Sequence, residues 1–141
     1  MEKATLKTAI IFNADAAEVW KGLTDPEIVK QYFYGTNLKS DFKKGSTITF
    51  SGEWDGKTYT DGGIILEIHE PFMLKYTYWS SMSGQADIPE NYADITYTLS
   101  EENGKTTLLI IQEGIKSQEE VATHEQNWQY VFDGLKKIIE K

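Results

Sequence analysis

Aromatic side chains spread along the chain could together form the walls of a binding pocket. Flat rings make apolar surfaces that exclude water, and a few polar groups among them can orient a guest molecule. Seven rings lie in segments that could face one space: Trp54, Tyr59, Tyr76, Tyr78, Tyr97, Trp128 and Phe132. Phe50, Gln112 and His124 complete the predicted set of ligand-binding residues. The same side chains could instead simply fill the core, and their spacing does not decide between the two interpretations.

His124 and Glu125 form a polar pair within the apolar stripe of the last predicted helix, one turn before Trp128. An unperturbed imidazole titrates near neutral pH, so His124 could orient a ligand or donate a proton. Alternatively, the first helical turn projects beyond the sheet and both side chains are solvated. We favour this second interpretation, because helix ends commonly fray.

Carboxylates on the predicted strands could support acid–base chemistry if two of them pointed into one cavity. The candidates are Glu53, Asp61, Glu67, Asp94 and Glu113. We expect most of them to face solvent. Glu113 is the first to consider, because it ends a strongly apolar strand and could approach His124. His69 lies just before a proline and is expected to be a surface turn residue.

The residue inventory excludes several kinds of chemistry. The chain has no cysteine, which removes disulfides, thiolate metal sites and cysteine nucleophiles, and it has only two histidines. Zinc-protease, EF-hand, nucleophile-elbow, dinucleotide-binding and P-loop motifs do not occur. We therefore predict no catalytic residue, no metal and no cofactor.

Length and charge limit the partners that we expect. A chain of 141 residues fits one domain covering residues 1–141, with enough hydrophobic residues (40%) for a packed core. The net charge of −8 would repel the phosphates of nucleic acid and of anionic membranes. The N-terminal apolar run, residues 9–12, is too short for a signal peptide or a membrane span, which predicts a cytoplasmic protein.

The N-terminal part of the chain predicts one strand followed by two short helices. Residues 5–12 are rich in Thr and Ile, which favours a strand. Asp15 with Glu18 is typical of a capping box at the start of a helix. Asp25-Pro26 predicts the start of the second helix, because proline is tolerated at the first helical position.

The middle of the chain, residues 38–113, shows β patterning. Asp55-Gly56 and Asn103-Gly104 are strong signals for tight hairpin turns. We expect strands at residues 47–54, 57–69, 72–79, 92–100 and 105–113. Residues 80–91 lack a period and predict a surface loop.

The last segment predicts one long helix that begins with a capping box, Ser117 with Glu120, and runs almost to Lys141. This order of elements describes an α+β domain in which the helix packs across a curved antiparallel sheet. Residues 108–111 are apolar at four successive positions, so one pair must face away from the core. That pair needs cover from the short helices or from a partner chain, which leaves both a monomer and a homodimer open.

Several strings in the chain resemble the helix-grip superfamily, which includes the START and birch-pollen-allergen-like proteins. Within it, the chain is most similar to the group named for the C-terminal domain of the activator of the heat-shock-protein-90 ATPase. The resemblance rests on Ala16-Ala17-Glu18-Val19-Trp20, Thr24-Asp25-Pro26, Tyr32-Phe33, Gly62-Gly63, Ile65 to Ile68 with Pro71, Leu74 to Trp79, Gly104-Lys105-Thr106, Glu113-Gly114, and Trp128 with Leu135.

This resemblance implies a helix-grip fold with a long C-terminal helix across the sheet, and a cavity between them. Such proteins range from lipid and hormone carriers to cyclases, hydroxylase subunits and co-chaperones, so the fold alone does not give the activity. Our first expectation is a non-catalytic domain that binds a small hydrophobic or aromatic molecule. The second is a co-chaperone-like module that binds a chaperone, and the third is a cyclase or hydrolase that uses His124 with a carboxylate.

Overall fold

The computed structural model describes residues 4–81 and 84–140, except for the side chain of Trp54. Its elements follow the predicted order, with β2 as an additional strand that was not predicted separately. The predicted loop at 80–91 contains one short 3-10 helix, η1, and its residues 82–83 lie outside the described residues. The elements are β1 (Ala4–Phe12), α1 (Ala16–Thr24), α2 (Pro26–Tyr32), β2 (Asn37–Ser40), β3 (Thr47–Trp54), β4 (Lys57–His69), β5 (Met73–Tyr78), η1 (Pro89–Asn91), β6 (Ala93–Glu102), β7 (Lys105–Ile115) and α3 (Gln118–Ile139).

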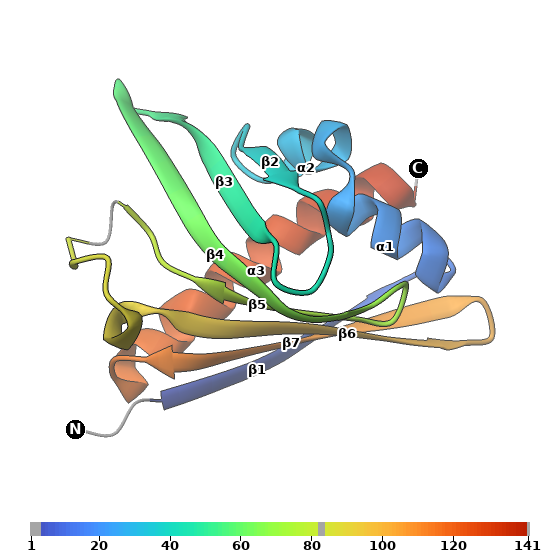
Figure 1. Ribbon diagram of the computed structural model, residues 1–141. Coiled ribbons are helices and arrows are strands. Elements are labelled where there is room, and N and C mark those ends of the chain that lie inside the picture. The colour runs from blue at the N-terminus through green and yellow to red at the C-terminus, as the bar shows by residue number, and fades with distance from the viewer. Residues whose placement is uncertain (1–3, 82–83, 141) are drawn as a thin grey trace.

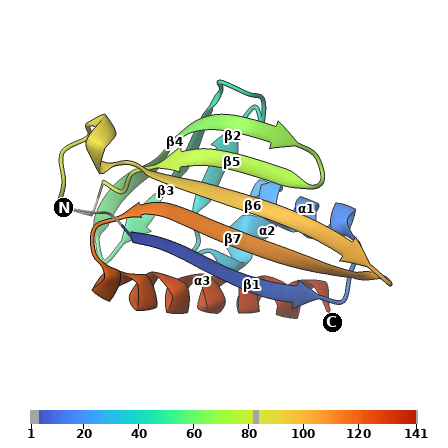
Figure 2. The ribbon, with the colours of Figure 1, turned by 90° about the horizontal axis from the view of Figure 1, so that it is seen from below.

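The strands form one antiparallel, strongly curved sheet in the order β1-β7-β6-β5-β4-β3-β2. All three α-helices lie on its concave side, with α3 running along the β1 and β7 end (Figures 1 and 2). The α+β helix-grip architecture is therefore confirmed. Within the described residues no helix is both long and apolar enough to span a membrane.

Both predicted hairpin turns are present and fix the register of their strands. Asp55 and Gly56 have positive φ, as do Asn103 and Gly104, which is the geometry that tight two-residue hairpin turns require. The first turn pairs Trp54 with Lys57 and the second pairs Glu102 with Lys105. Counting back from the first turn, Phe50 lies directly opposite Asp61, so both side chains share one face of the sheet.

Two of the three predicted helix caps form. The Asp15 carboxylate accepts from the backbone N–H of Glu18 at 2.8 Å, and the Asp25 carboxylate accepts from the backbone N–H of Glu27 at 2.9 Å. The capping box at Ser117 was wrong in its bonding, although α3 does begin just after that residue. The Ser117 hydroxyl lies 3.3 Å from the Glu120 carboxylate and makes no capping bond to a backbone N–H.

The inner face of α3 forms the main core with the sheet and the short helices. Trp128, Val131, Phe132 and Leu135 are buried, as the apolar stripe predicts. The rings of Trp128 and Phe132 stack on each other, and the ring of Tyr97 on β6 meets both edge-on. These contacts fix the distance between α3 and the middle of the sheet.

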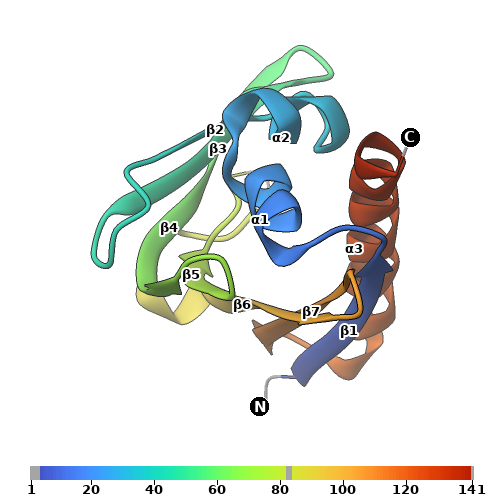
Figure 3. The same cartoon turned by 90° about the vertical axis from the view of Figure 1, so that its right-hand side faces the viewer.

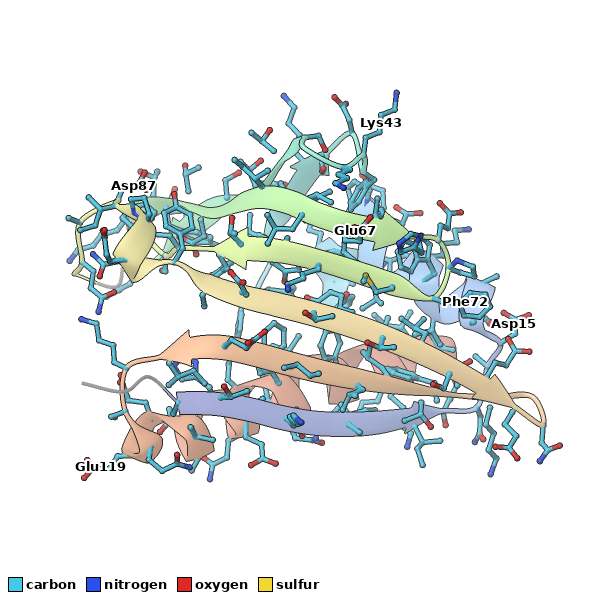
Figure 4. The ribbon with its side chains drawn as sticks, turned by 60° about the horizontal axis from the view of Figure 1, so that its bottom comes forward. Asp15, Lys43, Glu67, Phe72, Asp87 and Glu119 are labelled. Carbon is cyan, nitrogen blue, oxygen red and sulfur yellow. The ribbon has the colours of Figure 1, made fainter. Side chains whose placement is uncertain are left out.

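Among the residues that the structure describes, no α-helix covers the convex face of the sheet (Figure 4). Leu108 and Ile110 are fully buried on the concave side, whereas Leu109 and Ile111 point outward and are half-buried. Of the two predicted alternatives for covering this outward pair, the short helices are ruled out, because α1 and α2 lie on the opposite face. Neighbouring strands flank Leu109 with Ala9 and Thr98, and a homodimer stays a prediction.

The backbones of β4 and β3 approach each other closely at Gly62. Gly62 has a φ of +129°, and a Cβ there would lie 2.1 Å from the carbonyl oxygen of Ile48. Only glycine fits such a position. Gly62 also exchanges two backbone hydrogen bonds of 3.0 Å with Trp79, which holds the residue after β5 against the middle of β4. This junction places Asp61 close to Tyr78 and Ser81.

Candidate functional site

A cavity of about 570 Å³ lies between the sheet, the segment after α2 and the first half of α3. Figure 3 shows how the sheet curls from β1, beside α3, around to β2, beside α2. The described residues that line the cavity are Phe33, Tyr34, Thr36, Tyr59, Asp61, Tyr76, Tyr78, Ser80, Ile95, Gln112, His124, Asn127 and Trp128. Six of these thirteen side chains are aromatic, so the walls are mainly flat apolar surfaces.

The predicted ligand-binding residues divide into two groups. Those that line the cavity are Tyr59, Tyr76, Tyr78, Gln112, His124 and Trp128. Phe50, Tyr97 and Phe132 are buried in the core beside it, so for these three the core-filling interpretation describes their position. The side chain of Trp54 lies outside the described part of the structure.

The buried rings beside the cavity hold its walls in place. Tyr97 meets Tyr76 edge-on, with ring centres 5.6 Å apart, and Phe50 contacts both Tyr76 and Tyr78 at 5.9 Å. Edge-to-face contacts of this kind add stability beyond the burial of the rings. The lining rings are therefore packed from behind and have a fixed orientation.

Hydrogen bonds inside the cavity orient the polar groups. The indole N–H of Trp128 donates to Gln112 Oε1 at 2.8 Å, and the hydroxyls of Tyr76 and Tyr97 bond to each other at 2.7 Å. Because an indole N–H can only donate, the Gln112 amide must turn its carbonyl oxygen towards Trp128. The Gln112 Nε2 group has no protein acceptor within the described residues, so it offers two donors at the cavity wall.

A second set of bonds ties the segment after α2 to the rest of the cavity rim. Tyr34 donates to Asn127 Oδ1 on α3 at 2.6 Å, and its ring stacks on that of Tyr130. Thr36 and Tyr59 share a hydroxyl–hydroxyl bond of 2.6 Å. These contacts join α3, β4 and the start of β2 around one opening.

Asp61 is the one of the five candidate strand carboxylates that lines the cavity. Its Oδ2 accepts from the Tyr78 hydroxyl at 3.0 Å, and its Oδ1 accepts from the backbone N–H and the hydroxyl of Ser81 at 2.9 and 3.1 Å. Burial and the neighbouring Asp61 carboxylate raise the pKa of Tyr78, which therefore stays protonated and able to donate.

The other strand carboxylates lie away from the cavity. Glu53 and Glu113 are exposed, Asp94 is half-buried next to the inward-facing Ile95, and Glu67 lies near Lys44 and His69 on the surface. His69 is exposed, as expected.

The predicted approach of Glu113 to His124 was wrong. Gln112 points into the cavity, and successive strand residues alternate between faces, so Glu113 points outward. His124 itself is half-buried and lines the cavity, whereas Glu125 is exposed. The two residues therefore do not act as a polar pair, and solvation describes only Glu125.

Six lining residues were not predicted as site residues: Phe33, Tyr34, Thr36, Ser80, Ile95 and Asn127. Asp61 was predicted only as a candidate acid–base carboxylate. The turn at Asp55-Gly56 was sufficient to place Asp61 opposite Phe50, and Asn127 lies one helical turn after His124. Ile95 shares a strand face with Tyr97. No sequence pattern indicated that Phe33, Tyr34 and Thr36, which follow α2, line the cavity, because their position depends on tertiary contacts with α3 and β4.

Within the described residues, no group of three or more His, Asp or Glu side chains could hold a metal ion. The residues that line the cavity supply aromatic walls, one carboxylate, one imidazole and several neutral hydrogen-bonding groups. Such a composition suits recognition of a mostly apolar guest.

A family model described as "Activator of Hsp90 ATPase homolog 1-like protein" matches residues 13–140, which is most of the chain. The chain belongs to this activator-homologue family. The resemblance stated from the sequence is therefore confirmed.

Individual members of the activator-homologue family and proteins of the same fold support this assignment. The human protein "Activator of 90 kDa heat shock protein ATPase homolog 1" is 28% identical over 139 residues, which cover 97% of this chain and 37% of the human protein. The chain thus spans little more than a third of that relative. A solution structure from Cytophaga hutchinsonii is 37% identical with a TM-score of 0.86, covering 99% of this chain and 96% of its own.

A more distant structure shows how widely the fold of this family extends. DynU16, a protein of the dynemicin biosynthetic locus, is 20% identical with a TM-score of 0.80, covering 97% of this chain and 47% of its own. At this identity the likeness concerns the fold alone.

We predict that the buried tyrosines make the protein unstable in alkali. Burial raises the pKa of Tyr76, Tyr78 and Tyr97 above the ordinary value near 10. Below pH 10 these phenols are protonated in both the folded and the unfolded protein. Above it they ionise in the unfolded chain but not in the folded protein, so stability falls as pH rises towards the folded pKa. Each of these buried tyrosines should lower the free energy of unfolding by about 1.4 kcal/mol for every pH unit above 10.

Thermal melts between about pH 8 and 12 test this, with tyrosinate absorbance as a second readout. Tyr97→Phe should make the loss of stability above pH 10 less steep, whereas Tyr130→Phe, at an exposed position, should not change it. Ionisation of all eight tyrosines near pH 10 in the folded protein would contradict the predicted shifts.

Proposed function

We propose that this protein is a non-catalytic domain that binds a small aromatic or otherwise apolar molecule in the cavity. The observation that carries the proposal is the cavity itself, about 570 Å³ with six aromatic lining side chains. This volume lies within the range of small-molecule sites, which are typically apolar with a few placed polar groups. A flat guest would contact ring faces on several sides.

The polar groups of the cavity support binding of a guest with one acceptor atom. Gln112 Nε2 offers its donors at a buried position, and the bond from Trp128 fixes the direction of the amide. A ligand carbonyl or ring nitrogen placed there would satisfy donors that the protein leaves without an acceptor. Gln112 would thus orient the guest, with Tyr76 and His124 as further polar neighbours.

A non-catalytic role also agrees with the lack of a hydrogen-bonded histidine–carboxylate pair at the cavity among the residues that the structure describes. His124 makes no hydrogen bond to a carboxylate within the described residues, and Glu113 points away from it. Burial keeps the phenols of Tyr76 and Tyr97 protonated, so they cannot act as bases near neutral pH. Asp61 is a carboxylate in the same cavity as His124, but its printed partners are Tyr78 and Ser81, and within the described residues no hydrogen bond joins it to His124.

Filling the cavity should abolish binding while the fold is kept. Ile95 is buried and lines the cavity, so Ile95→Phe would project a ring into the space of the guest. We expect the variant to bind the neutral fluorescent probe N-phenyl-1-naphthylamine at least about tenfold more weakly than the wild type. Ile11→Phe is the matched control, because Ile11 is 55% exposed and lies on β1.

Near-ultraviolet circular dichroism should show that both variants keep native packing. If Ile95→Phe and Ile11→Phe bind the probe equally well, the probe does not occupy the cavity. If the wild type does not bind it either, the binding proposal is wrong for this class of guest.

A co-chaperone function is the second candidate, and the similarity to the human activator is the observation that favours it. That similarity covers 97% of this chain but only 37% of the human protein, so whatever the rest of the relative contributes is not covered by the match. In this case the protein would act in the cytoplasm, and its net charge of −8 would favour docking on basic patches of the chaperone.

Purified Hsp90 from the same organism provides the test. A co-chaperone should raise its ATPase rate, and the effect should weaken as NaCl is increased from about 0.05 to 0.3 M, because salt screens charge–charge contacts. The control is Ile95→Phe, which alters the cavity and leaves the surface charge unchanged. An unchanged ATPase rate at every salt concentration would rule out this function.

A further inference from the structure

We infer that the cavity selects aromatic ligands that are uncharged or positively charged, and that it rejects ligands carrying a carboxylate. This inference rests on the proposed function, because it names the charge class of the molecule that the same cavity would bind. It is drawn from the charges of the lining residues and from the partners of Asp61.

The lining has a negative charge with no lysine or arginine to balance it. Asp61 is a cavity residue, and none of the thirteen described lining residues is basic apart from His124. The chain has no arginine, since all 14 Lys and Arg residues counted are lysines. Arginine is the residue best suited to bind a carboxylate through two parallel hydrogen bonds. An anionic ligand would therefore lose its water shell without gaining a strong counter-charge.

Asp61 is also held in a fixed position, so its charge cannot easily turn away from a ligand. The bonds from Tyr78 and Ser81 reach both of its oxygens, and its place opposite Phe50 on β3 directs it to the concave face. Two carboxylate oxygens have about four lone-pair positions, so the three donors leave room for one more donor. A ligand ammonium or hydroxyl could supply that donor.

The aromatic walls add to the same preference. The faces of tyrosine and tryptophan rings carry partial negative charge and attract cations within about 6 Å. Tyr34, Tyr59, Tyr78 and Trp128 all line the space that Asp61 also lines. An aromatic cage with one carboxylate recognises an organic cation, whereas a fatty acid or another carboxylate meets repulsion from both kinds of group.

Displacement of N-phenyl-1-naphthylamine by two competitors of opposite charge tests the inference. 1-Naphthylmethylammonium and 1-naphthoate share one ring system and a one-carbon substituent, and differ mainly in charge. We expect the cation to displace the probe at a concentration at least about tenfold lower than the anion. The displacement titrations should be carried out at about pH 8, where a free imidazole is neutral. They should contain about 0.3 M NaCl, which screens the distant surface charges.

Asp61→Asn should reduce the ratio of the anion's to the cation's displacing concentration several-fold, because it removes the charge. The variant keeps one oxygen, which can still accept from Ser81, while its amide NH2 can donate to the Tyr78 hydroxyl. Asp94→Asn is the matched control, since it removes one charge from β6 at a position that alternates with the inward-facing Ile95. We expect the control to keep the wild-type ratio.

The outcomes separate the inference from the proposed function. Equal displacement by the two competitors in the wild type would overturn the charge preference and leave the binding function intact. This result does not depend on whether Asp61→Asn folds. An equal change in the ratio for Asp61→Asn and Asp94→Asn would show that net charge, and not Asp61, sets the preference. Failure of the probe to bind the wild type would overturn the binding function and the inference together.

Discussion

One helix is too narrow to cover a sheet of seven strands, and the architecture follows from this mismatch. Strands lie about 4.8 Å apart, whereas a helix with its side chains is about 10 Å across. α3 covers the edge of the sheet, where Gln129 bonds to Thr8 on β1 and Trp128 bonds to Gln112 on β7. The start of α1 is held near the β6–β7 hairpin, where the backbone N–H of Ala16 donates to Glu101. The cavity remains on the concave surface between the first half of α3 and the segment after α2.

The rings around the cavity resist its collapse because they are packed against one another. Trp128 stacks on Phe132, Tyr97 meets both of them, and Tyr76 is held by its hydroxyl bond to Tyr97. Closing the space would require these contacts to break or the side chains to leave their rotamers. No described side-chain nitrogen or oxygen that is fully buried lacks a hydrogen-bond partner. The polar groups left for a ligand are therefore those that face the cavity.

Much of the fold could be predicted from the sequence, because local signals define it. The two hairpin turns, the caps at Asp15 and Asp25 and the apolar stripe of α3 each depend on a few neighbouring residues. The predicted capping bond from Ser117 to a backbone N–H does not form, because the Ser117 hydroxyl interacts with the Glu120 side chain instead.

The site was harder to predict, because a residue's position on the inner face does not say whether it lines the cavity or packs behind it. Phe50, Tyr97 and Phe132 lie on the inner faces of their elements, yet neighbouring rings cover them. Asp61 could have been placed from the hairpin register. Tyr34 could not, because it reaches the site through its contacts with α3.

Isoleucine methyl NMR during a titration with N-phenyl-1-naphthylamine tests most directly whether an aromatic guest occupies this cavity. The method reports where the guest binds, since Ile95 lines the cavity whereas Ile11 and Ile64 are exposed elsewhere on the sheet. The account predicts a saturable shift of the Ile95 methyl signal with the Ile11 and Ile64 signals unchanged. Shifts confined to Ile11 or Ile64, or no shift at Ile95 while the probe fluorescence shows binding, would contradict it.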